Sequence, residues 1–132
     1  MTTAYQDRPL APPVIDPSTE HFWSAARDHL LKIRRCTACH KVHWYPRAVC
    51  PFCMGDTEWE EASGRGTVYS LTVTRRAGPI AYALAYVTLD EGVTLLTNIV
   101  DCDLDSVRIG DHVRVTFKQA EGGNTIPMFT PG

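Results

Sequence analysis

The 132-residue sequence has no long hydrophobic run, no large excess of charge of either sign and no internal repeat. No stretch approaches the roughly 20 apolar residues that a membrane-spanning helix needs, so we expect no membrane segment. The formal net charge is −2 and the isoelectric point is about 6.2. This balance lies well below that of a general binder of nucleic-acid backbones. With 44% hydrophobic residues, the chain can bury one modest core.

The familiar catalytic motifs are also missing. The sequence contains no nucleophile elbow, no HExxH pair, no phosphate-binding glycine loop and no distinctive spacing of Ser, His and Asp. Asp90 and Glu91 are adjacent acids, but neighbouring positions at a turn point apart into water. Cys102 stands between Asp101 and Asp103, whose carboxylates raise a thiol pKa and disfavour the nucleophilic thiolate. We therefore expect no catalytic residue in this chain.

The first residues carry no charged and then apolar pattern of the kind that marks a signal peptide. We therefore expect a cytoplasmic protein, in a compartment that keeps thiols reduced. Prolines fix the backbone and remove a hydrogen-bond donor, so a proline-rich polar start predicts an extended arm over residues 1–17, without a helix or a core strand. The prolines are Pro9, Pro12, Pro13 and Pro17.

Four of the five cysteines form two CxxC motifs that are separated by ten residues. Each motif presents two sulfurs from one tight turn, and two such turns can face each other around one metal ion. The spacing predicts a structural zinc site in a zinc ribbon. A shell of four protein thiolates leaves no position for a catalytic water, so the metal should hold structure. The predicted ligands are Cys36, Cys39, Cys50 and Cys53.

Other uses of these cysteines fit the sequence less well. Disulfides need an oxidising compartment, and a redox CxxC motif normally stands alone beside a βαβ pattern, which is missing here. Iron in a rubredoxin-like four-thiolate site remains an alternative to zinc. His40 and His43 lie in the loop and could replace a cysteine as ligand, although four thiolates already complete the shell.

Apolar residues at three- and four-residue spacing, from Phe22 to Ile33, predict a helix over residues 18–34. Asp16 or Ser18 can cap it. The ribbon should follow over residues 35–62. Ordering the chain costs roughly 1 to 2 kcal/mol per residue in entropy, and the few apolar side chains of the ribbon cannot offset this cost. Binding of structural zinc supplies roughly 10 to 16 kcal/mol. We therefore expect the ribbon to melt when the metal is removed.

From residue 63 the apolar pattern changes to a period of two, which indicates half-buried strands. In the first, we expect Tyr69, Leu71 and Val73 to share one face. Two more uniformly apolar strands, residues 80–89 and 93–100, flank a short glycine-containing turn. Strands over residues 111–118 and 126–129 follow, and Pro127 confines the last to an edge. The sequence thus predicts a mainly β protein with an N-terminal helix, in which a rubredoxin-like zinc ribbon precedes a small OB-fold barrel over residues 63–132.

Basic residues gather before and within the ribbon. Six of them lie between Arg27 and Arg47, against the single acid Asp28. Together with Trp44 and Tyr45, they would suit a ligand that carries both phosphates and an aromatic base, such as coenzyme A. Single-stranded nucleic acid would suit the same features. The structural alternative is a solvated basic face beside core aromatics.

In the order and spacing of its motifs, the sequence resembles the small zinc-ribbon and OB-fold proteins that accompany thiolase-like acyl-CoA enzymes. The resemblance covers nearly the whole chain. It includes Phe22-Trp23 before the CxxC motifs, the segment Gly64-Arg65-Gly66-Thr67-Val68-Tyr69-Ser70, and Ile126-Pro127-Met128-Phe129 at the end. The chain departs from the family pattern at His40 and Met54, where a glycine often follows the second cysteine of each motif.

The resemblance implies a non-catalytic accessory subunit of a thiolase-like complex, with a sterol-carrier-type thiolase as partner. The complex would cleave or form carbon-carbon bonds in acyl-CoA thioesters, for example in steroid or lipid side-chain degradation. A hetero-oligomer with two copies of each chain is expected. A single-stranded nucleic-acid-binding module is the alternative. The expected contacts with CoA or the partner are Arg34, Arg35, Trp44 and Arg47.

Overall fold

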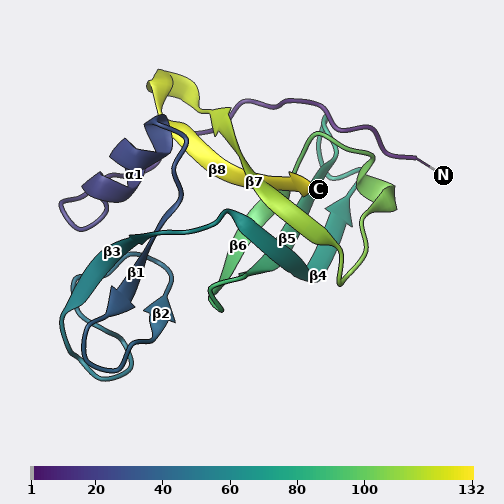
Figure 1. The fold of residues 1–132 in the computed structure, drawn as a ribbon. Coiled ribbons are helices and arrows are strands. Elements are labelled where there is room, and N and C mark those ends of the chain that lie inside the picture. The colour runs from purple at the N-terminus through teal and green to yellow at the C-terminus, as the bar shows by residue number, and fades with distance from the viewer. Residues whose placement is uncertain (1) are drawn as a thin grey trace.

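The computed structural model describes residues 2–132, and residues 2–16 form an extended arm that crosses the barrel (Figure 1). As the prolines predict, the arm contains no helix and no strand beyond one isolated bridge between Ala4 and Asp103. The backbone N–H of Thr3 donates to Asp103 Oδ1 at 2.8 Å, and the N–H of Leu104 donates to the Thr3 carbonyl at 2.8 Å. These contacts hold the arm against the barrel.

The helix α1 spans Glu20–Arg27 and buries Phe22, Ala25 and Ala26. Asp16 organises the turn that precedes it: its carboxylate accepts from the N–H of Ser18 at 2.9 Å, and its carbonyl accepts from the N–H of Glu20. Thr19 occupies the N-cap position without a side-chain capping bond. The helix packs against β8 and β1, which are defined below. None of the helices in residues 2–132 is long and apolar enough to cross a membrane.

The helix is shorter than the expected 18–34. It ends at Arg27 because His29 adopts a positive φ of 60°, which breaks the helical backbone. Residues Lys32–Cys36 instead form the strand β1, which pairs over its whole length with β3, Thr57–Glu61. Ile33 on β1 is fully buried in the apolar core. Its spacing from Phe22 suggested one continuous helix, but it contributes to the core from a strand.

The zinc ribbon is a three-stranded antiparallel sheet in the order β2-β1-β3, in which β2 is only Val42–His43. Figure 1 shows that this small sheet lies beside the barrel, and that the chain passes from β3 directly into the first barrel strand. The linker is tied at Ser63, whose N–H donates to Glu91 Oε2 at 2.8 Å. Glu91 was expected in a solvated turn. It instead connects the barrel hairpin to the end of the ribbon.

Five strands form the closed barrel in the order β4-β5-β6-β8-β7, with β7 returning to β4. This is the connectivity of an OB-fold. A short 3₁₀ turn, η1 (Leu104–Ser106), connects β6 to β7, and a second, η2 (Glu121–Gly123), connects β7 to β8. The strands are β4 (Arg65–Thr74), β5 (Tyr82–Leu89), β6 (Thr94–Ile99), β7 (His112–Gln119) and β8 (Thr125–Pro131).

One apolar core fills the barrel and extends to the helix and the ribbon, with Phe22, Ile33, Val87 and Phe129 among its fully buried members. The expectation that Pro127 confines the last strand to an edge is wrong, because β8 lies between β6 and β7 in the closed barrel. The strand tolerates the proline because it pairs with β7 along its length but with β6 only at Phe129. The barrel thereby closes through a single parallel contact.

The expected shared face of Tyr69, Leu71 and Val73 is wrong at its first member. A β-bulge between Val68 and Ser70 leaves Tyr69 without a partner on β5 and breaks the alternation of faces. Val68 is buried, and Tyr69 is 68% exposed. Leu71 and Val73 pack against the core as expected.

Candidate metal centre and its surroundings

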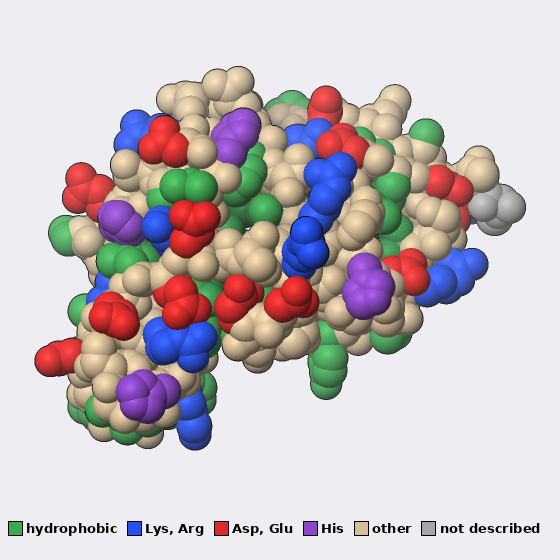
Figure 2. All heavy atoms as spheres, in the orientation of Figure 1, with side chains coloured by type: hydrophobic (Ala, Val, Ile, Leu, Met, Phe, Trp, Pro, Cys, Tyr) green, Lys and Arg blue, Asp and Glu red, His purple; other side chains and the backbone are tan. Residues whose placement is uncertain are grey.

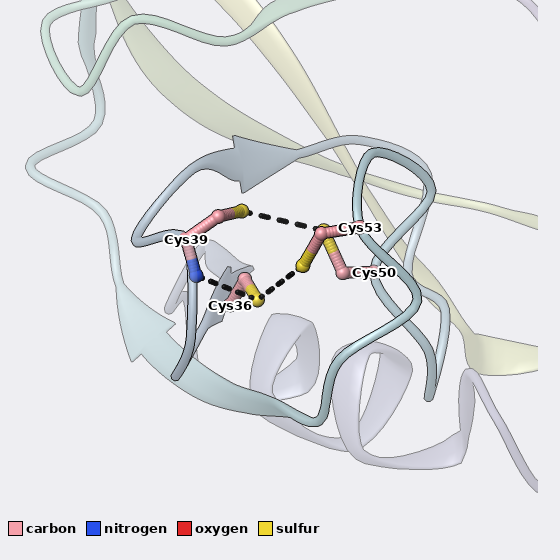
Figure 3. Close-up of side chains that lie close together, drawn as sticks. All are labelled: Cys36, Cys39, Cys50 and Cys53. Carbon is pink, nitrogen blue, oxygen red and sulfur yellow. Dashed lines mark hydrogen bonds between the residues drawn. The ribbon is translucent and has the colours of Figure 1, made fainter.

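The four predicted cysteine ligands converge at the end of the ribbon. Their sulfur atoms all lie within 4.8 Å of one another. Figure 3 shows the four side chains pointing toward a common centre from two facing turns. The sulfurs of Cys36 and Cys53 are 3.4 Å apart, and those of Cys39 and Cys50 are 3.7 Å apart. Both separations are far longer than a disulfide bond of about 2.05 Å.

These distances fit a metal held by four thiolates. A tetrahedral shell with zinc–sulfur bonds of about 2.3 Å has sulfur–sulfur edges of roughly 3.8 Å. Each turn also directs backbone N–H groups at its first sulfur: those of Ala38 and Cys39 donate to Cys36 Sγ at 3.3 Å, and that of Phe52 donates to Cys50 Sγ at 3.4 Å. The bonds from Cys39 and then Ala38 lower the pKa of Cys36 to about 6. These bonds therefore favour the thiolate form of Cys36, the form that binds metal.

The backbone around the cysteines is tight. His40 and Met54, each one residue after the second cysteine of its motif, have φ values of 63° and 65°. Both therefore occupy the left-handed region, at a cost of roughly 1 to 2 kcal/mol each. At Gly55, a Cβ atom would lie 3.3 Å from the sulfurs of Cys36 and Cys53. A side chain there would crowd the ligands.

Neither histidine of the loop joins the sulfur cluster. His43 lies on β2 opposite Arg34 and is buried, and neither ring nitrogen has a hydrogen-bond partner among the described residues. Burial lowers the pKa of His43, and the nearby guanidiniums of Arg34 and Arg47 lower it further. The imidazole is therefore neutral near pH 7 and belongs to the ribbon core.

The basic residues of β1 are engaged within the ribbon. Arg34 donates from Nε to Thr57 Oγ1 and from NH2 to the Thr57 carbonyl, both at 2.8 Å. Its guanidinium also lies 4.5 Å from the centre of the Trp59 ring. Arg35 forms an ion pair with Glu60. The structure thus gives both arginines structural contacts inside the sheet that the sequence did not indicate.

Trp44 and Arg47 differ in their surroundings. Trp44 is half-buried, and its ring packs edge-on against Phe22 at 5.0 Å and Tyr45 at 5.6 Å. It joins the ribbon to the helix. Arg47 is exposed, and no carboxylate within residues 2–132 pairs with its guanidinium.

The fifth cysteine is separate from the metal centre. Cys102 follows β6 and is partly buried against the core. Burial raises the pKa of its thiol, and the carboxylates of Asp103 and Asp101 raise it further. This is the environment that the sequence predicts for an unreactive thiol.

The outer surface of β5 and β6 is a feature that sequence analysis missed. Inward and outward side chains alternate, and the outward ones carry no charge. Leu84, Tyr86 and Leu96 are 37%, 47% and 54% exposed, and Tyr86 stands directly opposite Leu96. We call this surface the neutral face. It consists of Tyr82, Leu84, Tyr86, Thr88, Thr94, Leu96 and Asn98.

Two family models match consecutive parts of the chain. Residues 23–60 match the rubredoxin-like zinc ribbon domain of ChsH2, and residues 59–118 match the C-terminal OB-fold domain of ChsH2. The two matches divide the chain where the ribbon passes into the barrel.

Individual relatives agree with these matches. A DUF35 domain-containing scaffold protein of Methanothermobacter thermautotrophicus is 38% identical over 64% of this chain and 69% of its own length. A probable enoyl-CoA hydratase alpha subunit of Thermomonospora curvata is 35% identical over 98% of this chain, which spans only 42% of that protein.

A solved structure entitled Ltp2-ChsH2(DUF35) aldolase contains a chain that superposes with a TM-score of 0.78 at 34% identity, covering 91% of this chain and 98% of the other. The superposition includes both the ribbon and the barrel, so the two chains share the same two-domain fold. On the strength of both family models and these relatives, the chain belongs to the DUF35 family, whose members join a ChsH2-type rubredoxin-like zinc ribbon to an OB-fold domain.

Proposed function

We propose that the chain is a non-catalytic accessory subunit that docks a thiolase-like catalytic partner and helps it to hold an acyl-CoA thioester. The relatives support this proposal, since they are named as a scaffold protein, as a probable enoyl-CoA hydratase alpha subunit and as part of an aldolase. The reaction, aldol or thiolytic cleavage of a carbon-carbon bond in a steroid or lipid side chain, belongs to the partner. The expected assembly contains two copies of each chain.

The neutral face is the observation that best supports docking to a protein. In an OB-fold, the surface of the second and third strands is the usual ligand face, and here these strands are β5 and β6. Nucleic-acid binders place basic and aromatic side chains on it. The strands β5 and β6 place two aromatic rings, Tyr82 and Tyr86, on this face and no Lys or Arg, and Arg8 of the arm lies over the Tyr82 ring at its edge. Exposed leucines beside a tyrosine suit burial against another protein.

The metal centre has a structural role in this proposal. Zinc bound by Cys36, Cys39, Cys50 and Cys53 would be closed by protein ligands and would fix the two turns. The strands β1 and β3 continue from those turns to the barrel. The metal-stabilised ribbon would therefore keep a fixed position beside the catalytic partner when that partner binds to the barrel.

The residues that the sequence indicated as CoA or partner contacts divide into two groups. Arg34 and Arg35 are positioning residues, because their guanidiniums bind β3. Arg47 is exposed and can contact a ligand or the partner, whereas Trp44 packs against Phe22 at the junction of helix and ribbon. If Arg47→Ala leaves both partner affinity and acyl-CoA affinity unchanged, the role proposed for Arg47 is wrong.

An affinity capture of the tagged, metal-loaded chain from its native cytoplasm tests the function. One sample is treated with nuclease and a parallel sample is not, and the retained proteins are identified by mass spectrometry. The proposal predicts a stoichiometric thiolase-like enzyme that survives nuclease. Recovery of nucleic acid, with protein partners lost on nuclease treatment, would reject it in favour of a nucleic-acid-binding module.

A further inference from the structure

Two arginines face each other where β4 meets β7. The register places Arg65 directly opposite Arg114, a position at which like charges repel. Both side chains are exposed. Within residues 2–132, the cations that form ion pairs are Lys32, Arg35, Arg75 and Lys118, so neither Arg65 nor Arg114 has a carboxylate within 4.0 Å. Two guanidiniums that lie side by side without a carboxylate form a local positive field that favours an anion between them.

The two arginines line a hollow of about 610 Å³. This volume is within the range of small-molecule sites. Figure 2 shows the corresponding blue stripe over the barrel, where β4 and β7 meet beside the end of β8. His112 adds a ring N–H donor, and Asp90 adds a single carboxylate. The lining residues are Arg65, Gly66, Asp90, His112, Val113, Arg114 and Gly132.

Backbone hydrogen bonds connect the segments that line the hollow. The Arg114 side chain lies across Gly132, where an added Cβ would come within 2.9 Å of Arg114 Nε. The N–H of Gly132 donates to the His112 carbonyl at 3.3 Å, and the N–H of Asp90 donates to the Arg65 carbonyl at 2.9 Å. Three separate segments are thereby fixed around the pair of guanidiniums. The spacing of the backbone positions that carry the positive groups is therefore set by the fold.

We propose that Arg65, Arg114 and His112 bind the phosphate groups of a phosphorylated small molecule. Guanidinium forks present paired N–H donors that match phosphate oxygens, and two adjacent forks suit a ligand with more than one negative charge. Asp90 weakens the site for anions by its own charge. The neutral face adjoins this site through β5 and carries no such cations, so the phosphate site is a distinct surface of the barrel.

The source of the phosphate is the phosphorylated nucleotide end of acyl-CoA, a choice that rests on the proposed function. Free pyrophosphate has the same charge chemistry without the nucleotide or the acyl chain. The two sources can be separated because only CoA presents an adenine ring and a pantetheine arm in addition to its phosphates. The site itself does not depend on the identity of the partner.

The test is a titration of the full-length, metal-loaded chain, labelled with ¹⁵N, with CoA, dephospho-CoA and sodium pyrophosphate. We expect the amide signals of Gly66, His112 and Val113 to shift on binding. Arg65→Gln and Arg114→Gln should each weaken binding about tenfold or more. Asp90→Asn should tighten binding severalfold. Arg76→Gln removes an exposed arginine outside the hollow and should bind as the unmodified chain does. The spectra also report whether each variant is folded.

Each result decides the proposal. If CoA binds more tightly than pyrophosphate and both weaken in Arg65→Gln and Arg114→Gln, the site and CoA as its source are supported. If the two probes bind equally and both weaken, the phosphate site is supported and CoA is not its preferred source. Failure of all three probes to bind, or unchanged affinity in both variants, would overturn the site. Capture of a thiolase-like partner by a chain that binds no phosphate would overturn this inference alone and leave the proposed function standing.

Discussion

Arg35 on β1 and Glu60 on β3 form an ion pair through two parallel hydrogen bonds. Arg35 Nε donates to Glu60 Oε1 at 2.8 Å, and NH2 donates to Oε2 at 3.0 Å. The remaining nitrogen, NH1, donates to the carbonyl of His40 at 2.8 Å. One guanidinium thus connects the first cysteine turn to the strand that leads into the barrel. Arg35 therefore stabilises the ribbon itself.

A double-mutant cycle with Arg35→Gln and Glu60→Gln should show this coupling. The pair is partly exposed, so we expect an interaction free energy of about 0.5 to 1 kcal/mol, the upper end for surface pairs because of the two-bond geometry. Thermal unfolding of the metal-loaded proteins measures it. Strictly additive effects of the two substitutions would show that the ion pair contributes nothing.

The same pair predicts a pH dependence. The hydrogen bond from Arg35 lowers the pKa of the Glu60 carboxyl below its ordinary value of 4.5. Because the folded-state pKa is the lower one, the contribution is fully present above about pH 4.5 and is lost as the pH falls through the lowered value. Between pH 6 and pH 3, Glu60→Gln should lose less stability than the unmodified protein. Equal losses of stability in the two proteins would contradict this assignment.

Metal removal should unfold the ribbon and leave the barrel. Binding of structural zinc contributes roughly 10 to 16 kcal/mol of folding free energy in small zinc domains. The sheet of β1, β2 and β3 has few apolar contacts of its own. After treatment with a chelator, amides of residues 35–60 should lose protection from hydrogen exchange, whereas those of β4 to β7 should keep it. Protection that is unchanged throughout the ribbon would show that the metal is dispensable for its folding.

Single cysteine variants provide the matched control. Cys39→Ser removes one of the four thiolates. Because only three remain, the variant should bind less metal, and the ribbon amides should lose protection from hydrogen exchange. Cys102→Ser changes the cysteine outside the cluster and should retain a full complement of metal. Metal analysis of the purified variants also identifies the ion. Normal metal content in Cys39→Ser would contradict the four-thiolate assignment.

Gly64 should be intolerant of any side chain. Its φ is 80°, and a Cβ would lie 2.5 Å from Val115 Cγ1, while its carbonyl accepts from the Val115 N–H at 2.6 Å. Gly64→Ala should destabilise the barrel by roughly 2 to 5 kcal/mol, from backbone strain and overpacking together. Gly78→Ala is the control, since a Cβ there meets nothing within 4 Å. Equal melting temperatures for the two variants would count against the register of β4 and β7.

The cysteine ligands and the five barrel strands could be predicted because their signals are local. Two CxxC motifs specify the metal centre by spacing alone, and alternation with period two identifies strands one at a time. The end of the helix could not be predicted in this way. Ile33 keeps a helical spacing from Phe22, but its conformation is decided by pairing with Glu60 on β3, far along the chain.

Features that depend on the register between paired strands could not be predicted from the sequence either. The bulge at Tyr69 arises from how β4 meets β5, and the contact between Ser63 and Glu91 joins residues 28 positions apart. The facing of Arg65 and Arg114 requires the barrel to close. The neutral face is hidden in the sequence because its leucines and tyrosine read as core residues until the inward and outward sides of β5 and β6 are known.

The central claim is that the neutral face docks a catalytic protein partner, and one comparison of affinities tests it most directly. Leu96→Asp places a charge on that face beside Tyr86, and Ile109→Asp places the same charge at an apolar residue that is 69% exposed before β7. Binding of each metal-loaded variant to the purified thiolase-like partner is measured by calorimetry. The account predicts that Leu96→Asp binds at least about tenfold more weakly, whereas Ile109→Asp binds like the unmodified chain. Equal affinity of the two variants would contradict docking through the neutral face.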